Sequence, residues 1–305
     1  MTTQTVTPEL RQWIIEQARA GCRPEDVLEA MRSSGWDEDV AIAALEQALA
    51  GQLPTHGLAA AAASALAAHG RPVVQQPQTH QQPLPAVVAV PEPDLRLSPA
   101  RLWAHDREVA VLAVMQHPRV VVFGGLLSDD ECDAMVAAAG PRMARSETVV
   151  YETGGNEVNA ARTSEGMFFG RAENALCERI EARIAALLRW PVENGEGLQV
   201  LHYRPGAEYK PHHDYFDPAQ PGMAAVLRRG GQRVATVVMY LNTPEQGGAT
   251  TFPDVGLEVA PVKGHAVFFS YDRAHPVTRT LHGGAPVIRG DKWVATKWLR
   301  EREFV

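Results

Sequence analysis

Two stretches of the chain carry residue types that can bind a metal ion. Residues 211–216 read PHHDYF and place His212 and Asp214 two positions apart. Side chains two positions apart on a β-strand point to the same side, so we expect His212 and Asp214 to face one way and His213 the other. A second histidine from a distant strand would complete a 2-His-1-carboxylate facial triad, which leaves adjacent positions open on Fe(II) for an oxidant and a co-substrate.

The best candidate for that second histidine is His282, in the segment LHGGAPVIRGDKW. The main alternative is His275, in RAHPVTRTLH, but the glycines after His282 and the lysine ten residues further on favour His282. We expect His275 to be a loop residue, His202 a strand residue, and His213 to point away from the site. An isolated His-x-Asp pair is more often an ordinary surface or core pair, so the surrounding residues decide its interpretation.

Lys292 is the lysine that follows His282 at ten residues. In DKWVATKW it shares strand parity with Val294, Thr296 and Trp298, a largely apolar set. Burying an ammonium group without an anionic partner is costly. We therefore expect a bound anion to accompany Lys292.

These residues belong to a longer pattern. The first segment, YRPGAEYKPHHD, has the form Y-x2-G-x2-Y-x2-H-x-D, and the second has the form H-x-G-x-P-V-x2-G-x-K-W. The chain thereby resembles the prolyl 4-hydroxylase family of Fe(II)/2-oxoglutarate dioxygenases, and the likeness runs from VVVFGGLLSDDEC to the final strand. The segments GGQRVATVVMYLNTPEQGGATTFP and ARTSEGMFF are also similar to strands of that family.

The resemblance implies a role for each matching residue. His212, Asp214 and His282 would bind Fe(II), with 2-oxoglutarate and O2 as co-substrates and ascorbate as a further requirement. Lys292 would bind the far carboxylate of 2-oxoglutarate, with Tyr203 as a second contact and Trp298 packed beside it. Ordinary core packing is the alternative for Tyr203 and Trp298.

The implied reaction is hydroxylation of proline at the 4-position in a peptide or protein, with succinate and CO2 as the other products. Arg162, Ser164 and Arg233 correspond to family positions that meet the peptide, although ion-pair or strand-surface roles are equally compatible with the sequence. The same chemistry on a free amino acid, another side chain or a small metabolite is the first alternative, because substrate loops vary freely on such a scaffold. A non-catalytic jelly-roll binding module is the second, and the complete set of ligands with Lys292 argues against it.

The elements that would position these residues begin near residue 95. Two helices, over SDDECDAMVAAAG with Ser128 as N-cap and over RAENALCERIEARIAALLRW, accompany many short strands separated by Gly, Pro and Asn. This pattern predicts an α+β, mainly β fold: a double-stranded β-helix, or jelly roll, with buttressing helices, over residues 95–305.

The chain before residue 95 divides in two. Residues 1–50 show three short helical patterns and predict a small three-helix module that resembles ubiquitin-associated bundles and could bind a protein partner. A helical cap or dimerisation hairpin is the plainer alternative for this module. Residues 51–94 form an Ala-, Pro- and Gln-rich linker, in which Arg71 is the only charged residue before Glu92.

Bulk composition excludes several classes of protein. The net charge of −7 and the pI near 5.9 leave no basic field to hold a nucleic acid. The three cysteines are far apart, which argues against a disulfide framework or a thiolate metal site. The N-terminus lacks the regions of a signal peptide, and no apolar run reaches the roughly 20 residues needed to cross a bilayer. We therefore expect a cytoplasmic protein without membrane contact.

Overall fold

The structure is a computed structural model of the 305-residue chain. It describes residues 84–145 and 163–305, the strand pairs at 148–149 and 156–157, and residues 14–15, 27–28, 31, 36, 40–42 and 44–45. Its contacts divide the chain into two units, residues 1–80 and residues 81–305. The predicted domain boundaries at residues 50 and 94 remain predictions, since most of residues 1–83 lie outside the described part.

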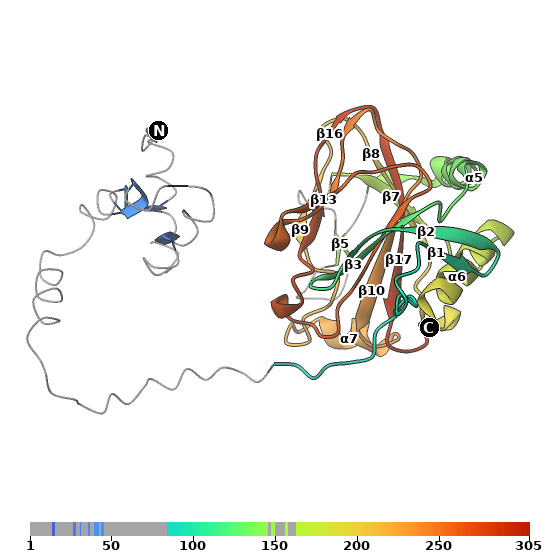
Figure 1. The fold of residues 1–305 in the computed structure, drawn as a ribbon, viewed down its shortest axis with the longest axis horizontal. Helices are drawn as coiled ribbons and strands as arrows, with labels where there is room; N and C mark the ends of the chain where they lie inside the picture. Colours follow the sequence, from blue (N-terminus) through green and yellow to red (C-terminus); the bar gives the residue numbers. More distant parts are fainter. Residues whose placement is uncertain are drawn as a thin grey trace, which may run out of the picture. The chain divides into compact units, whose positions relative to one another are not determined.

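The second unit is built on a nine-stranded sheet (Figure 1). Its strands are, in spatial order, β1 (Arg101–Ala104), β2 (Arg107–Met115), β3 (Arg119–Gly124), β14 (Ala266–Ser270), β10 (Arg233–Tyr240), β17 (Lys292–Arg300), β8 (Gln199–Tyr203), β7 (Glu165–Phe168) and β4 (Ala144–Arg145). All of its pairings are antiparallel. The central strands β10 and β17 come from distant parts of the chain, so the sheet joins the sequence segments that hold the candidate site residues.

A smaller sheet carries the metal-ligand motifs. Its order is β13 (Leu257–Val259), β12 (Thr250–Phe252), β15 (His282–Gly284) and β9 (Tyr209–His212). Two further pairs are β11 (Gln246–Gly247) with β16 (Val287–Arg289), and β5 (Thr148–Val149) with β6 (Asn156–Glu157). The fold is thus mostly β with a few helices, as the sequence predicts.

Two apolar cores lie on the two faces of the large sheet. One core joins sheet residues such as Phe123 and Val237 to helices α5 (Asp129–Ala139) and α6 (Ala175–Leu188). The other joins large-sheet residues such as Val294 to Phe252 of the small sheet. Figure 1 shows α5 and α6 on one side of the large sheet and β9 and β13 on the other. The helices therefore buttress one face, and the second face is left for the site.

Local sequence explains the ends of the two long helices. The Ser128 side chain accepts a hydrogen bond from the Glu131 backbone N–H, and the Glu131 side chain accepts one from the Ser128 backbone N–H. This reciprocal capping box confirms the predicted N-cap and satisfies two otherwise unpaired donors. The Asn174 side chain caps α6 by accepting one hydrogen bond from the Cys177 backbone N–H.

The structure adds elements that the sequence patterns did not predict. One is the β1–β2 hairpin, whose turn places His105 at a positive φ of 56°. A short helix, α7 (Met223–Arg228), is also added, and 3-10 turns cover Gly140–Arg142, Val192–Asn194, Pro253–Val255 and Pro276–Thr278.

The predicted three-helix module falls almost entirely outside the described residues. The described positions within it are helical apart from Trp36, and six of them, Ile14, Val27, Met31, Ala41, Ala44 and Leu45, share one buried apolar cluster. The module remains a prediction. In the part of the chain that the structure does describe, no helix combines the length and the apolar character needed to cross a bilayer.

Candidate metal and dicarboxylate site

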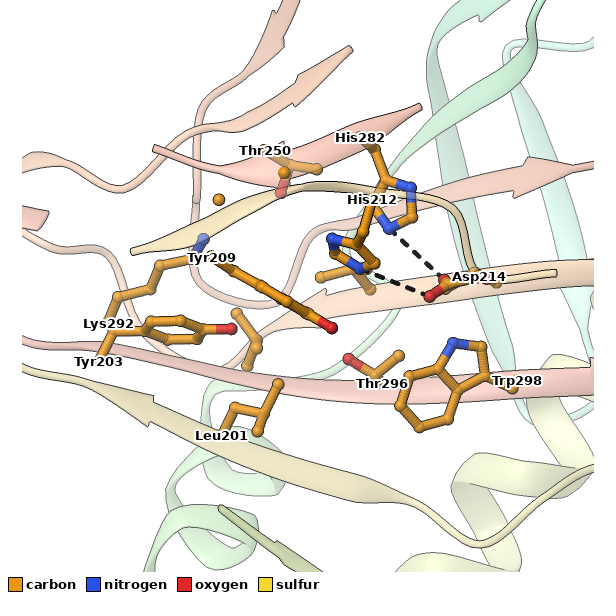
Figure 2. Close-up of a pocket in the computed structure, with 15 residues that line it drawn as sticks. Leu201, Tyr203, Tyr209, His212, Asp214, Thr250, His282, Lys292, Thr296 and Trp298 are labelled. Atoms are coloured by element: carbon orange, nitrogen blue, oxygen red, sulfur yellow. Dashed lines mark hydrogen bonds and ion pairs between the residues drawn. The ribbon is translucent and has the colours of Figure 1, made fainter. Parts of the chain in front are cut away.

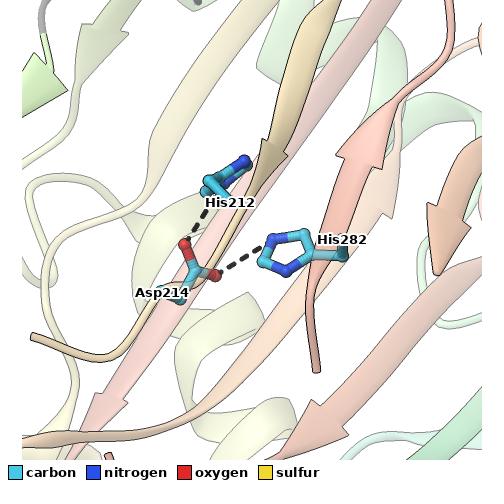
Figure 3. Close-up of side chains that lie close together, drawn as sticks. All are labelled: His212, Asp214 and His282. Carbon is cyan, nitrogen blue, oxygen red and sulfur yellow. Dashed lines mark ion pairs between the residues drawn. The ribbon is translucent and has the colours of Figure 1, made fainter. Parts of the chain in front are cut away.

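His212, Asp214 and His282 converge at the small sheet. One donor atom from each lies within 4.8 Å of the other two (Figure 3). His212 Nε2 lies 3.6 Å from one carboxylate oxygen of Asp214, and His282 Nε2 lies 3.5 Å from the other. The structure thus brings together the three residues that the sequence selected, and it leaves His275 outside the cluster.

Strand register explains this convergence. In the antiparallel β9–β15 pair, His212 and His282 are direct Cα partners. A Cβ at Gly283 would lie only 2.9 Å from the Tyr209 carbonyl oxygen, so the glycine after His282 permits the close approach of the two strands. Strand β9 ends at His212, and Asp214 lies in the bend beyond it. The bend, rather than the strand parity that we expected, therefore directs Asp214 toward the histidines.

Hydrogen bonds to the backbone set the tautomer of both histidines. The Nδ1 atom of His212 lies 2.9 Å from the Lys210 carbonyl oxygen, and that of His282 lies 2.9 Å from the Thr280 carbonyl oxygen. A carbonyl oxygen can only accept, so each Nδ1 carries the proton and donates it. The Nε2 atoms then keep their lone pairs and face Asp214, as is usual for metal-binding histidines.

Electrostatics show that the three donors fit a cation. Burial lowers the pKa of His282 to about 4, so its ring is neutral near pH 7. Burial alone would raise the pKa of Asp214, but His282, His212 and Arg233 hold it below the usual range. The Nε2 atoms of His212 and His282 and the Asp214 carboxylate therefore face one another at distances too long for hydrogen bonds. A divalent metal ion satisfies all three, and a 2-His-1-carboxylate set suits Fe(II).

Lys292 lies in the same pocket as the ligand cluster (Figure 2). It is 4% exposed, and burial lowers its pKa to about 8. It is the Cα register partner of Tyr203, and its Nζ lies 5.3 Å from the centre of that ring and 6.0 Å from the centre of Tyr240. No ion pair joins this ammonium to a carboxylate among the described residues.

Glycine keeps the ammonium group accessible from the pocket. A Cβ at Gly284 would lie 3.7 Å from Lys292 Nζ, so the absence of a side chain leaves that space open. Thr250 also lines the pocket, and its hydroxyl accepts a hydrogen bond of 2.8 Å from Tyr240. Lys292, Tyr203 and Thr250 therefore offer one cation and two hydroxyl groups to a bound anion.

Trp298 occupies a different place from the one we expected. Figure 2 shows it at the opposite end of the pocket from Lys292 and Tyr203, close to Asp214. The reason is strand length, because the six residues from Lys292 to Trp298 along β17 span about 20 Å. The expectation that Trp298 packs beside Tyr203 is corrected accordingly. Its indole Nε1 is buried and has no hydrogen-bond partner among the described residues.

The three predicted substrate residues have different fates. Arg162 lies outside the described residues. Ser164 is described and buried just before β7. Arg233 makes a bidentate ion pair with Glu196, with N···O distances of 2.7 and 2.9 Å, and its guanidinium carbon lies 3.9 Å from the centre of a Trp298 ring. Arg233 therefore borders the tryptophan end of the pocket, and its contact with substrate remains a prediction.

Several residues of the site escaped sequence reasoning. The Glu196 carboxylate accepts hydrogen bonds from both Arg233 and Arg300. Burial alone would raise the pKa of Glu196, but these two arginines hold it below the usual range. Tyr209 is a position of the sequence motif to which no role was assigned, and it stacks on the His212 ring with centres 3.7 Å apart. The Thr236 hydroxyl donates a hydrogen bond to Asp214. The only hint of this contact in the sequence was a polar residue inside the apolar strand segment VATVVMY.

The histidines that we did not take as ligands have other partners. The His202 ring stacks on Trp293 and lies 3.0 Å from Asp291. The His275 side chain accepts a hydrogen bond from the Val277 backbone N–H and caps the 3-10 turn at Pro276–Thr278. His213 stacks on Tyr215, with ring centres 4.6 Å apart.

Fold and site together define a metal-dependent oxygenase that binds a dicarboxylic acid, and comparisons with known proteins identify its family. The sequence model of the 2OG-Fe(II) oxygenase superfamily matches residues 198–300. Prolyl 4-hydroxylase 5 of Arabidopsis thaliana is 40% identical over 216 residues, which cover 64% of this chain and 72% of that protein. Prolyl 4-hydroxylase 1 of Arabidopsis thaliana is 40% identical over 227 residues, or 66% and 78% of the two chains.

A solved structure of the viral collagen prolyl hydroxylase vCPH from Paramecium Bursaria Chlorella virus-1, in a 2OG complex, is 32% identical to this chain. It covers 59% of this chain and 95% of its own, with a TM-score of 0.46. From the sequence relatives, the chain belongs to the prolyl 4-hydroxylase family of 2OG-Fe(II) oxygenases. It is a 2-oxoglutarate-dependent dioxygenase.

Proposed function

We propose that the protein hydroxylates proline at the 4-position in a peptide or protein, with Fe(II), 2-oxoglutarate and O2. The observation that carries the proposal is one pocket that holds both the His212, Asp214 and His282 donors and the buried Lys292. Neither feature alone is specific. Their combination matches the two ends of a chelating keto acid, one end binding a metal and the other a cation.

The metal centre is formed by three residues of the chain. His212 and His282 would bind Fe(II) through Nε2, because their Nδ1 atoms donate to backbone carbonyl groups. Asp214 would bind through its carboxylate. When bound, Fe(II) supplies the oxidative chemistry that couples decarboxylation of 2-oxoglutarate to hydroxylation of a C–H bond.

The far carboxylate of 2-oxoglutarate would be held by Lys292. Because burial destabilises the isolated ammonium, an anion that neutralises it gains more binding free energy than it would at the surface. The Tyr203 and Thr250 hydroxyl groups, at the same end of the pocket, would donate hydrogen bonds to the remaining oxygen lone pairs of that carboxylate. These contacts orient the co-substrate so that its keto acid end points at the ligand cluster.

The substrate would enter at the other end, beside Trp298 and Arg233. The buried indole Nε1 is a hydrogen-bond donor with no partner among the described residues, and a peptide carbonyl oxygen would satisfy it. The Arg233 guanidinium lies over one face of the Trp298 indole, and the opposite face of the indole would suit a proline ring. Arg162 and Ser164 are proposed to contact the same peptide.

The family and the sequence support further proposals on the sheet topology, on ascorbate, on the cellular compartment and on residues 1–94. We propose that the facing sheets form a double-stranded β-helix, that ascorbate sustains turnover, and that the protein acts in the cytoplasm. Residues 1–50 are proposed to recruit a protein partner and residues 51–94 to act as the linker, with neither needed for the chemistry at the site.

A succinate-release assay over a panel of proline-rich peptides tests the proposed function. We expect 2-oxoglutarate turnover that depends on both Fe(II) and peptide, with a matching mass increase of one oxygen atom on a proline of the peptide. Asp214→Ala is the control, because it removes the anionic metal ligand and should abolish turnover.

Substrate alternatives are separated in the same experiment. Turnover with free proline or with small metabolites, but not with peptides, would contradict the peptide substrate and leave the oxygenase chemistry in place. The visible charge-transfer band of the anaerobic Fe(II) and 2-oxoglutarate complex reports on the centre without any substrate. Its absence from the wild-type protein would contradict the proposed chemistry itself.

A further inference from the structure

A chain of two buried hydroxyl groups leads away from the candidate metal ligand Asp214. The Thr236 hydroxyl donates a hydrogen bond of 2.7 Å to Asp214 Oδ2, and the Tyr271 hydroxyl lies 3.0 Å from the same Thr236 oxygen. Thr236 is fully buried and Tyr271 is 2% exposed. Water therefore does not compete with these two bonds from the bulk solvent.

The direction of the chain follows from proton counting. An ionised carboxylate can only accept, so the single hydroxyl proton of Thr236 is used in the bond to Asp214. Tyr271 must then be the donor to Thr236. The two bonds point the same way, from Tyr271 through Thr236 to Asp214, and bonds aligned in this manner strengthen one another.

The three residues come from different parts of the fold. Thr236 lies on β10 in the middle of the large sheet, and Tyr271 follows β14, the neighbour of β10. Asp214 follows β9 of the small sheet. The hydrogen bond from Thr236 therefore connects Asp214, in the bend after the small sheet, to the centre of the large sheet.

We propose that Thr236 and Tyr271 are positioning residues that hold the Asp214 carboxylate in its metal-binding orientation. The bond to Oδ2 restrains rotation of the carboxylate about its Cβ–Cγ bond, so both oxygens stay opposite the Nε2 atoms of His212 and His282. Tyr271 acts only through Thr236. The inference rests on the metal centre of the proposed function and goes beyond it in naming what orients that centre.

The measurement is the dissociation constant of Mn(II), titrated into the metal-free 305-residue chain and followed by the loss of the free-ion electron paramagnetic resonance signal. Thr236→Val keeps the shape of the side chain and removes the hydroxyl. Loss of a residue that orients a metal ligand weakens metal affinity about 10- to 100-fold, and we expect an increase of that size. Tyr271→Phe should raise the constant by a smaller factor, since Thr236 keeps its own bond to Asp214.

Two further variants distinguish positioning from general stability. Thr236→Ser restores a hydroxyl and should bind Mn(II) within about twofold of the wild type, whereas a merely structural role would show no such rescue. Adding Tyr271→Phe to Thr236→Val should cause no additional loss, because residues that act through one another are not additive. Thr163→Val is the matched control: its hydroxyl bonds the Glu208 backbone instead of a ligand, and Mn(II) affinity should not change.

The possible failures are distinct. A wild-type protein that does not bind Mn(II) would overturn the metal centre and this inference with it. A wild type that binds, together with a folded Thr236→Val variant of equal affinity, would overturn the inference alone, as would the absence of rescue by Thr236→Ser. If Thr236→Val does not fold, an unchanged Mn(II) affinity in Tyr271→Phe would overturn the inference.

Discussion

Replacing Lys292 with methionine tests the dicarboxylate site through two effects of opposite sign. The first is on co-substrate binding. Truncating one member of a buried charge pair costs about 2–5 kcal/mol. At about 1.4 kcal/mol for each factor of ten, the dissociation constant for 2-oxoglutarate should rise between about 30-fold and about 4,000-fold. Metal affinity should change little, because Lys292 donates no ligand.

The second effect is on stability without ligand. Burial lowers the pKa of Lys292 from 10.5 to about 8, so the folded protein disfavours the ammonium form. Below about pH 8 this costs about 3 kcal/mol, and between about pH 8 and 10.5 the free energy of unfolding rises with pH, because the unfolded chain then holds a proton that the folded protein has lost. Lys292→Met removes this cost, so the ligand-free variant should be more stable near neutral pH than the wild type.

Calorimetric titration of 2-oxoglutarate into the anaerobic Mn(II)-loaded protein measures the first effect, and urea unfolding of the metal-free protein measures the second. The wild-type dissociation constant should increase above about pH 8, by up to about tenfold per pH unit, as Lys292 loses its proton. The constant of Lys292→Met should not depend on pH over that interval. Equal affinity in variant and wild type, or a wild-type affinity that is flat across this interval, would refute the assignment of Lys292.

Three further predictions concern other parts of the chain. Lys297→Met should lower the free energy of unfolding, measured in urea, by about 3–5 kcal/mol. The reason is that the buried Glu181 carboxylate, 2.5 Å from Lys297 Nζ, loses its cation. The double variant Lys297→Met, Glu181→Leu should recover most of that loss, and no recovery would contradict this explanation. Ser128→Ala should cost about 1 kcal/mol by loss of the helix cap, with KM for peptide unchanged. Trp298→Phe should raise KM for peptide about 2- to 12-fold, because the Nε1 hydrogen-bond donor is lost. A parallel rise in KM for 2-oxoglutarate would instead indicate that Trp298 contacts the co-substrate.

The residue types of the site and the caps of the long helices could be predicted from the amino-acid sequence. The motif that contains His212, Asp214, His282 and Lys292 predicted the ligands and the cation through its resemblance to a family, and the structure gathers all four in one pocket. The cap at Ser128 was equally readable, since a capping box involves only neighbours three residues apart. Features of this kind follow from short-range periodicity and hydrogen bonding, which a single segment contains in full.

Tertiary structure decided what lies around those residues. The placement of Trp298 near Asp214, the Arg233 and Glu196 pair, and the bond from Thr236 to Asp214 all join segments that are far apart in the chain or on different sheets. The bend after β9 also redirected Asp214 in a way that strand parity did not foresee. Strand periodicity predicts on which side of its own strand a side chain lies, but not which other strand packs against that side. That choice depends on pairing and packing summed over the whole fold, and no single segment of sequence contains that information.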